Sequence, residues 1–215
     1  MLLELFLSFF AIFLLLMVTE YLWRSKRLHI ETSRKIVHIG TGVIIAFWPY
    51  FISWELIQLA SLLLLAVVFI SYRFKIFRSI HSIKRLTVGE LLYPVGIGLC
   101  TLLEPAPWAF TIAILHLTLA DGLAAVAGIK YGRRTMYNIL SHKKSLVGSG
   151  VFFTTSLVIL VTASWILPDS DLPEYYGYFL LISLGLTVIE NLSWYGLDDI
   201  SVPLATIALL HLLPM

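Results

Sequence analysis

Long apolar segments alternate with short polar ones along the whole chain. Eight apolar runs occur, at residues 2–23, 36–52, 54–72, 88–104, 107–127, 148–167, 174–194 and 200–214. A helix needs roughly 20 apolar residues to cross a bilayer, and only helices and closed barrels satisfy every backbone polar group in lipid. The pattern therefore predicts transmembrane helices. The runs at 36–52 and 200–214 are short, so we expect eight spans, or seven if one of these two does not cross.

The composition agrees with a membrane protein. Of the 215 residues, 59% are apolar and only 13% are charged, whereas a soluble domain carries roughly 25% charged residues. Little chain remains for a separate soluble domain, so we expect one all-α, polytopic membrane domain over residues 1–215. The net charge of +2 is too small to suggest nucleic acid. The single cysteine, Cys100, can form neither an internal disulfide nor a thiolate metal site.

The basic residues predict the orientation of the chain. All 15 Lys and Arg residues lie in three loops, at 24–35, 73–85 and 130–144, which follow the first, third and fifth spans. These loops share one side of the membrane, and the positive-inside rule places that side in the cytoplasm. The N-terminus is therefore expected outside. Because the bases follow the first apolar run, we expect a retained helix and not a signal peptide.

Acidic residues lie at the inner ends of the same predicted spans. They are Asp121, Glu90, Glu190, Asp198 and Asp199. Charges at membrane depth are costly and usually functional. A carboxylate near a helix N-terminus can simply favour the helix dipole, which is the alternative explanation for Glu90, Asp198 and Asp199. Asp121 lies towards the C-terminal end of its span, where the dipole disfavours an anion, so it is the strongest candidate for a functional role.

Several carboxylates beside several bases are typical of nucleotide chemistry. Carboxylate oxygens are the ligands that Mg²⁺ prefers, and Lys and Arg neutralise phosphate oxygens. In the first basic loop, Arg34 and His38 share a helix face at the spacing i, i+4, with Lys35 adjacent. His38 could bind phosphate, orient a hydroxyl or act as a base. The alternative for the bases is that they only anchor the helix at the membrane surface.

The loop after the fifth span combines glycines with lysines. Glycines let backbone amides approach phosphates, and lysines add positive charge. The loop has no P-loop motif, and its first two glycines could equally serve close helix packing. The candidate phosphate contacts are Gly128, Gly132, Lys143, Lys144, Ser145 and Gly148.

Five short motifs follow one another along the chain. They are Arg34-Lys35-x-x-His38, Gly89-Glu90-x-x-Tyr93-Pro94, Ala120-Asp121-Gly122 with Gly128 and Gly132, Lys144-Ser145-x-x-Gly148, and Glu190 with Asp198-Asp199. In this order they resemble the CTP-dependent lipid alcohol kinases, namely dolichol kinase, phytol kinase and the CTP-dependent diacylglycerol kinase. That family is related to the phosphatidate cytidylyltransferases, whose H-G-G-x-x-D-R signature is absent here. Many family members have Glu where this chain has Val147.

The resemblance implies that the γ-phosphate of CTP is transferred to a lipid alcohol, either an isoprenoid of the polyprenol or phytol type or diacylglycerol. It implies an active site at the cytoplasmic face and Mg²⁺, or another divalent cation, on Asp121 with Glu90 or Asp199. Arg34 and Lys35 would join the phosphate contacts of the loop. The residues expected in catalysis are Asp121, Glu90, His38, Lys144 and Asp199.

Two alternatives from other classes remain open. A cytidylyltransferase would make a CDP-lipid and release pyrophosphate. A small membrane transporter would predict inverted repeats and charges near the middle of the bilayer, and the sequence has neither. The oligomeric state is not predicted.

Overall fold

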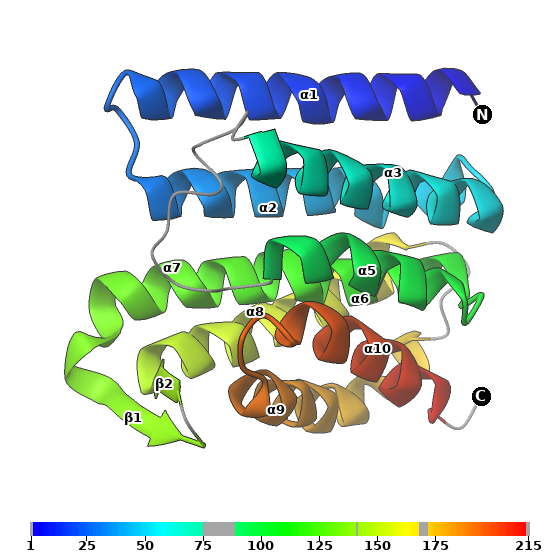
Figure 1. Cartoon of the computed structure of the whole chain (residues 1–215). Helices are drawn as coiled ribbons and strands as arrows, with labels where there is room; N and C mark the ends of the chain where they lie inside the picture. Colours follow the sequence, from blue (N-terminus) through cyan, green and yellow to red (C-terminus); the bar gives the residue numbers. More distant parts are fainter. Residues whose placement is uncertain (1, 75–88, 141, 168–171, 214–215) are drawn as a thin grey trace.

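The computed structural model describes residues 2–74, 89–140, 142–167 and 172–213, and most of them lie in helices that run side by side (Figure 1). The short helical turns are η1 (Trp48–Tyr50), η2 (His116–Ala120), η3 (Gly132–Thr135) and η4 (Leu172–Tyr175). The longer helices are α1 (Leu2–Arg24), α2 (Ile30–Ala46), α3 (Trp54–Phe74), α5 (Gly89–Thr101), α6 (Pro107–Leu115), α7 (Asp121–Tyr131), α8 (Leu146–Ile166), α9 (Tyr176–Leu192) and α10 (Asp198–His211). The predicted helical architecture is confirmed for the described residues, apart from one short hairpin.

A helix lies at each of the eight predicted spans, with α6, η2 and α7 forming one of them. Among the described residues, four segments are long and apolar enough to cross a membrane, as expected for an integral membrane protein: Leu3–Arg24, Trp54–Phe74, Pro107–Thr135 and Leu146–Ile166. The 17 residues of α2 and the 14 of α10 give lengths of about 25 and 21 Å. A bilayer core is about 30 Å thick. The count of eight crossings and the outside N-terminus remain predictions.

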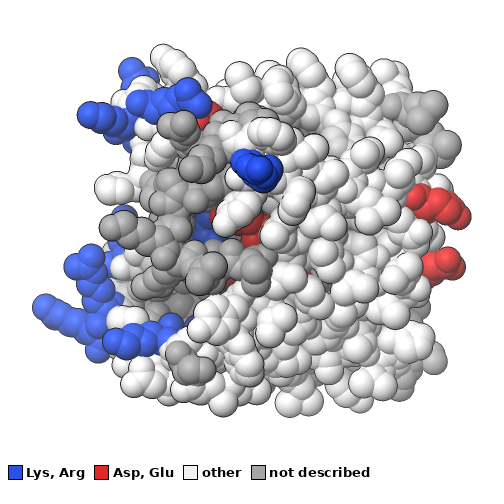
Figure 2. Space-filling view, viewed as in Figure 1, with Lys and Arg blue, Asp and Glu red and all other residues white. Residues whose placement is uncertain are grey.

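Lys and Arg side chains gather at one end of the bundle. In Figure 2 the blue side chains project mainly at the left, and acidic side chains project at the opposite end. The start of α1 and the end of α10 also lie at that opposite end (Figure 1). This arrangement agrees with the predicted grouping of the basic loops. Most of the second basic loop lies outside the described residues.

The helix α6 occupies the centre of the bundle. Its residues from Trp108 to Ile114 are all buried. Part of them packs with α8, α9 and α10, and the rest packs with α1, α2, α3 and α5. A helix that is apolar all round is typical of such a position. Because α6 is held on all sides, it fixes the position of η2 and α7, which continue it.

Glycines permit two close helix contacts. Where the end of α7 and the start of η3 meet the residue before α8, a side chain on Gly128 or Gly132 would meet the hydroxyl of Ser145. Between α5 and α10, a side chain on Gly96 would overlap the backbone oxygen of Asp199. Small residues allow membrane helices to approach in this way. The structure therefore supports the packing alternative for Gly128 and Gly132.

A β-hairpin replaces the loop that we expected after α7. Strand β1 (Met136–Ile139) pairs antiparallel with β2 (His142–Ser145), and Tyr137 lies opposite Lys144. Successive side chains of a strand point to opposite faces. As a result, Lys144 is half-buried against the bundle, whereas Lys143 is exposed.

Candidate active site

Asp121 begins α7, directly after the π-helical turn η2. Its backbone N–H donates to the carbonyl of His116, five residues earlier, which is the hydrogen bond of a π-helix. The helix then continues to Tyr131. Asp121 is therefore not at a helix C-terminus, and the dipole argument made for it from the sequence is wrong. Its position after a π-helical turn is instead the local feature that is frequent at functional sites.

Two residues of α2 approach the carboxylate of Asp121. Lys35 Nζ donates to Oδ2 at 2.7 Å, and His38 Nε2 lies 3.6 Å from the same oxygen. His38 Nε2 is also 3.1 Å from the carbonyl oxygen of Leu117, in η2. A carbonyl can only accept, so this nitrogen carries a hydrogen. In the neutral ring, Nδ1 is then the nitrogen that can take a proton.

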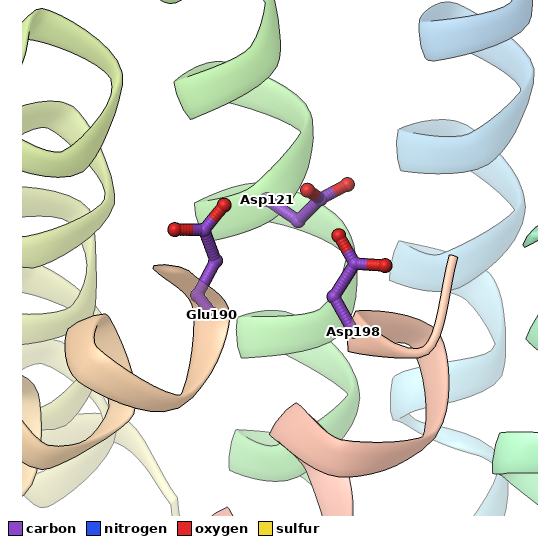
Figure 3. A group of neighbouring side chains, drawn as sticks. All are labelled: Asp121, Glu190 and Asp198. Atoms are coloured by element: carbon purple, nitrogen blue, oxygen red, sulfur yellow. The ribbon is translucent and has the colours of Figure 1, made fainter. Parts of the chain in front are cut away.

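Three carboxylates from three elements point towards a common space (Figure 3). Asp121 of α7, Glu190 near the end of α9 and Asp198 at the start of α10 have carboxylate oxygens within 4.8 Å of one another. Such a group is suited to a hard divalent cation with oxygen ligands. We predicted that Asp121 would bind the metal with Glu90 or Asp199, whereas within the described residues Asp121 is grouped with Glu190 and Asp198.

Lys144 of β2 contacts the carboxylate group at Glu190. Its Nζ lies 2.5 Å from Glu190 Oε1 and 3.0 Å from the Glu190 backbone oxygen. The next residue, Ser145, caps α8, since its hydroxyl accepts from the N–H of Gly148 at 3.1 Å. One lysine therefore pairs with Asp121 and another with Glu190, so two of the three carboxylates have a basic partner.

Asn191 ties the hairpin to the end of α9. Its side-chain oxygen accepts hydrogen bonds from the hydroxyls of Tyr137, at 2.6 Å, and Ser149, at 2.9 Å. Its backbone oxygen lies 3.0 Å from His142 Nε2. Sequence reasoning missed this network, because the partners lie 42 to 54 residues from Asn191 along the chain. The hydrogen bonds fix the strand that carries Lys144.

A cavity of about 250 Å³ lies beside Asp121. At one end it is polar, and at the other it is walled by apolar side chains of α1 and α3. Asp199 is part of the polar end and is only 7% exposed. The candidate residues that line the cavity are Arg34, Lys35, His38, Glu90, Asp121 and Asp199, joined by Asp198. Gly128, Gly132, Lys143, Lys144, Ser145 and Gly148 are not among its lining residues.

Comparison with known proteins finds a relative that covers most of the chain. A phytol kinase from Synechocystis sp. (strain ATCC 27184 / PCC 6803 / Kazusa) is 30% identical over 188 residues, which cover 82% of this chain and 76% of that protein. No protein-family model matches the chain. No solved structure matches it either.

Proposed function

This chain belongs to the family of lipid alcohol kinases that includes phytol kinase, and we propose that it transfers the γ-phosphate of CTP to a lipid alcohol at the cytoplasmic face of a multi-pass domain. The alcohol oxygen forms a bond to the γ-phosphorus, the bond from that phosphorus to the β–γ bridging oxygen breaks, and CDP leaves. The hydroxyl proton passes to a base. Such transfer depends mainly on positioning and on neutralising charge.

The observation that carries this proposal is the two-part cavity beside Asp121. A lipid alcohol has one reacting hydroxyl and an apolar chain. The cavity offers charged side chains from α2, α7 and α10 at one end and aliphatic side chains from α1 and α3 at the other. The hydroxyl would therefore lie at the charged end, next to the three carboxylates, while the chain faces the aliphatic wall.

The carboxylates of Asp121, Glu190 and Asp198 fit a divalent cation such as Mg²⁺. Their oxygens lie within 4.8 Å of one another, and two of the acids are paired with lysines. A cation bound there would neutralise charge on the nucleotide phosphates. Lys35 pairs with Asp121 and Lys144 pairs with Glu190, and these contacts direct both carboxylates into the group.

Asp199 is our candidate for the base that takes the hydroxyl proton. It lines the cavity with Glu90, and a side chain on Gly89 would come within 3.0 Å of Asp199 Oδ2. The glycine thus leaves room for this carboxylate at the polar end. His38, through Nδ1, is the alternative. Loss of a general base costs roughly 10²–10⁴-fold in rate. The rates of the Asp199→Asn and His38→Gln variants therefore distinguish the two candidate bases.

The first test is a kinase assay on the purified protein in detergent. CTP or ATP labelled at the γ-phosphate is supplied with phytol, farnesol, a polyprenol or diacylglycerol. We expect labelled lipid phosphate and CDP when CTP is the donor. If no pair gives labelled lipid phosphate, the kinase proposal is wrong. In a parallel assay with phosphatidic acid or a prenyl phosphate as acceptor, release of pyrophosphate and formation of a CDP-lipid would instead indicate a cytidylyltransferase.

The second test concerns the metal. We expect Asp121→Asn to lower kcat by roughly 10²–10³-fold or more, because an electrostatic element of the transition state is removed. Chelation should abolish the activity of the unchanged protein, and Mg²⁺ should restore it. Glu55→Gln, at an exposed position at the start of α3, is the control and should keep full activity. An Asp121→Asn protein with normal kcat would contradict the metal assignment.

A further inference from the structure

The apolar wall of the cavity follows one face of α1 and one face of α3. Ile12 and Leu16 are four residues apart and share a face of α1. Leu64, Val68 and Ser71 have the spacing i, i+4, i+7 on α3. Seven residues correspond to about 10 Å of helix. These side chains therefore line an elongated groove that runs along the bundle.

The groove changes from apolar to polar in one direction. Helix α3 runs towards the basic end of the bundle, so Ser71 lies nearer that end than Leu64. Lys35 and His38, near the start of α2, line the cavity at the polar end. A molecule with its hydroxyl at Asp121 would thus extend its chain away from the basic end, along α3.

The groove also reaches the outer surface of the protein. Val67 lines the cavity, yet it is 44% exposed. Its neighbours Leu63 and Ile70 are exposed as well, as expected for a surface that faces lipid. Helix α1 packs on α2 and helix α3 packs on α5, and both α1 and α3 contribute side chains to the apolar wall of the cavity. A chain in the groove could therefore continue into the bilayer.

We propose that this groove, formed by Ile12, Leu16, Leu64, Val67 and Val68, selects alcohols with a single chain, which enter from the bilayer between α1 and α3. The inference rests on the proposed kinase function. At about 250 Å³, the cavity is smaller than the 300–1,000 Å³ typical of ligand pockets. It holds the reacting hydroxyl and the carbons next to it, and the rest of the chain stays in lipid. Diacylglycerol carries two acylated arms next to its hydroxyl and is excluded.

The kinetic test uses a variant in which a larger side chain fills the groove. We expect Val68→Trp to lower kcat/KM for phytol by at least about tenfold, because an added ring overpacks the site. The KM for CTP should stay unchanged, because Val68 is not among the predicted phosphate contacts. Leu62→Trp, at a 62% exposed position on the same helix, is the matched control. Equal use of diacylglycerol and phytol by the unchanged protein, or a Val68→Trp protein with normal kcat/KM for phytol, would overturn the proposal.

A binding test does not depend on turnover. In a Cys100→Ala background, Val68→Cys is alkylated with a membrane-permeable maleimide in the presence of phytol, hexadecanol or dioleoylglycerol. Phytol and hexadecanol should slow alkylation severalfold, whereas dioleoylglycerol should not, and Leu62→Cys should show no protection. Protection by dioleoylglycerol, or by none of the three, contradicts the groove assignment. If protection occurs but no alcohol is phosphorylated, the kinase function fails and the groove stands.

Discussion

Two adjacent lysines of β2 have different environments. Lys144 pairs with the carboxylate of Glu190, while Lys143 is exposed on the other face of the strand. We expect Lys144→Ala to raise the KM for CTP or lower kcat by roughly 10²-fold, since a charge near the phosphates is lost. Unfolding should also occur at lower temperature, because removing one partner of a buried ion pair costs about 3–5 kcal/mol. Steady-state kinetics and a thermal melt in detergent measure both effects.

The matched variant Lys143→Ala should leave KM, kcat and melting temperature close to those of the unchanged protein. The sequence assigned both lysines to phosphate binding. An equal rise in the KM for CTP in the two variants would support that assignment and would argue against a selective role for Lys144.

Sequence reasoning noted Glu190, Asp198 and Asp199 among the acidic residues at the inner helix ends, but it proposed only Asp199 of these three as a metal ligand. Asp198 and Asp199 are consecutive at the start of α10, and consecutive helical residues point about 100° apart. Asp198 consequently joins the carboxylate group, and Asp199 is directed to the polar end of the cavity. Which of the two faces Asp121 depends on the rotation of α10 about its axis. That rotation is set by packing on α5 at Gly96, which a single sequence does not reveal.

The hairpin is the element whose position depends most on side-chain hydrogen bonds. Tyr137→Phe removes one of the two hydroxyls that bind Asn191, and a single hydrogen bond is worth about 1 kcal/mol. We expect the KM for CTP to rise by roughly fivefold, with kcat and melting temperature nearly unchanged. The measurement is a CTP titration at saturating alcohol. Tyr178→Phe, near the start of α9 and 45% exposed, is the control. A fall in kcat with an unchanged KM would show that the hairpin does not position a phosphate contact.

The helices were predictable from the sequence, whereas two irregular elements, the π-helical turn η2 and the β-hairpin, were not. The residues of η2 continue an apolar run without a break in pattern, so nothing local distinguishes a π-helical turn from an α-helix. Its neighbours are distant in sequence: His116 Nε2 lies 2.8 Å from Ser156 Oγ, and His38 binds the carbonyl of Leu117. Similarly, the hairpin contacts the end of α9. Both elements thus make contacts with residues that are distant in the sequence, and the hydrophobic periodicity of the sequence cannot reveal such contacts.

Across the whole molecule, apolar length and the distribution of bases anticipate both the helices and the charged end of the bundle, because each is a local property of the chain. The number of crossings depends on the two short helices, α2 and α10. The chain offers a direct test, since its single cysteine, Cys100, is buried. In a Cys100→Ala background, one cysteine is introduced at Ser25, Ser53 or His211, all of which are exposed.

With eight spans, Ser25→Cys should react with a membrane-impermeant maleimide only from the cytoplasmic side, because it follows α1 among the bases. Ser53→Cys should react only from outside if α2 crosses, and His211→Cys only from outside if α10 crosses. Sealed vesicles of both orientations provide the measurement, and detergent-opened vesicles show that each site can react. Cytoplasmic labelling of His211→Cys together with outside labelling of Ser53→Cys would show that α10 does not cross. Cytoplasmic labelling of both Ser53→Cys and His211→Cys would show that α2 does not cross, because every later span is then inverted. Either result would reduce the count to seven. Outside labelling of Ser25→Cys would reverse the orientation and place Asp121 and its lysines on the wrong side for cytoplasmic CTP.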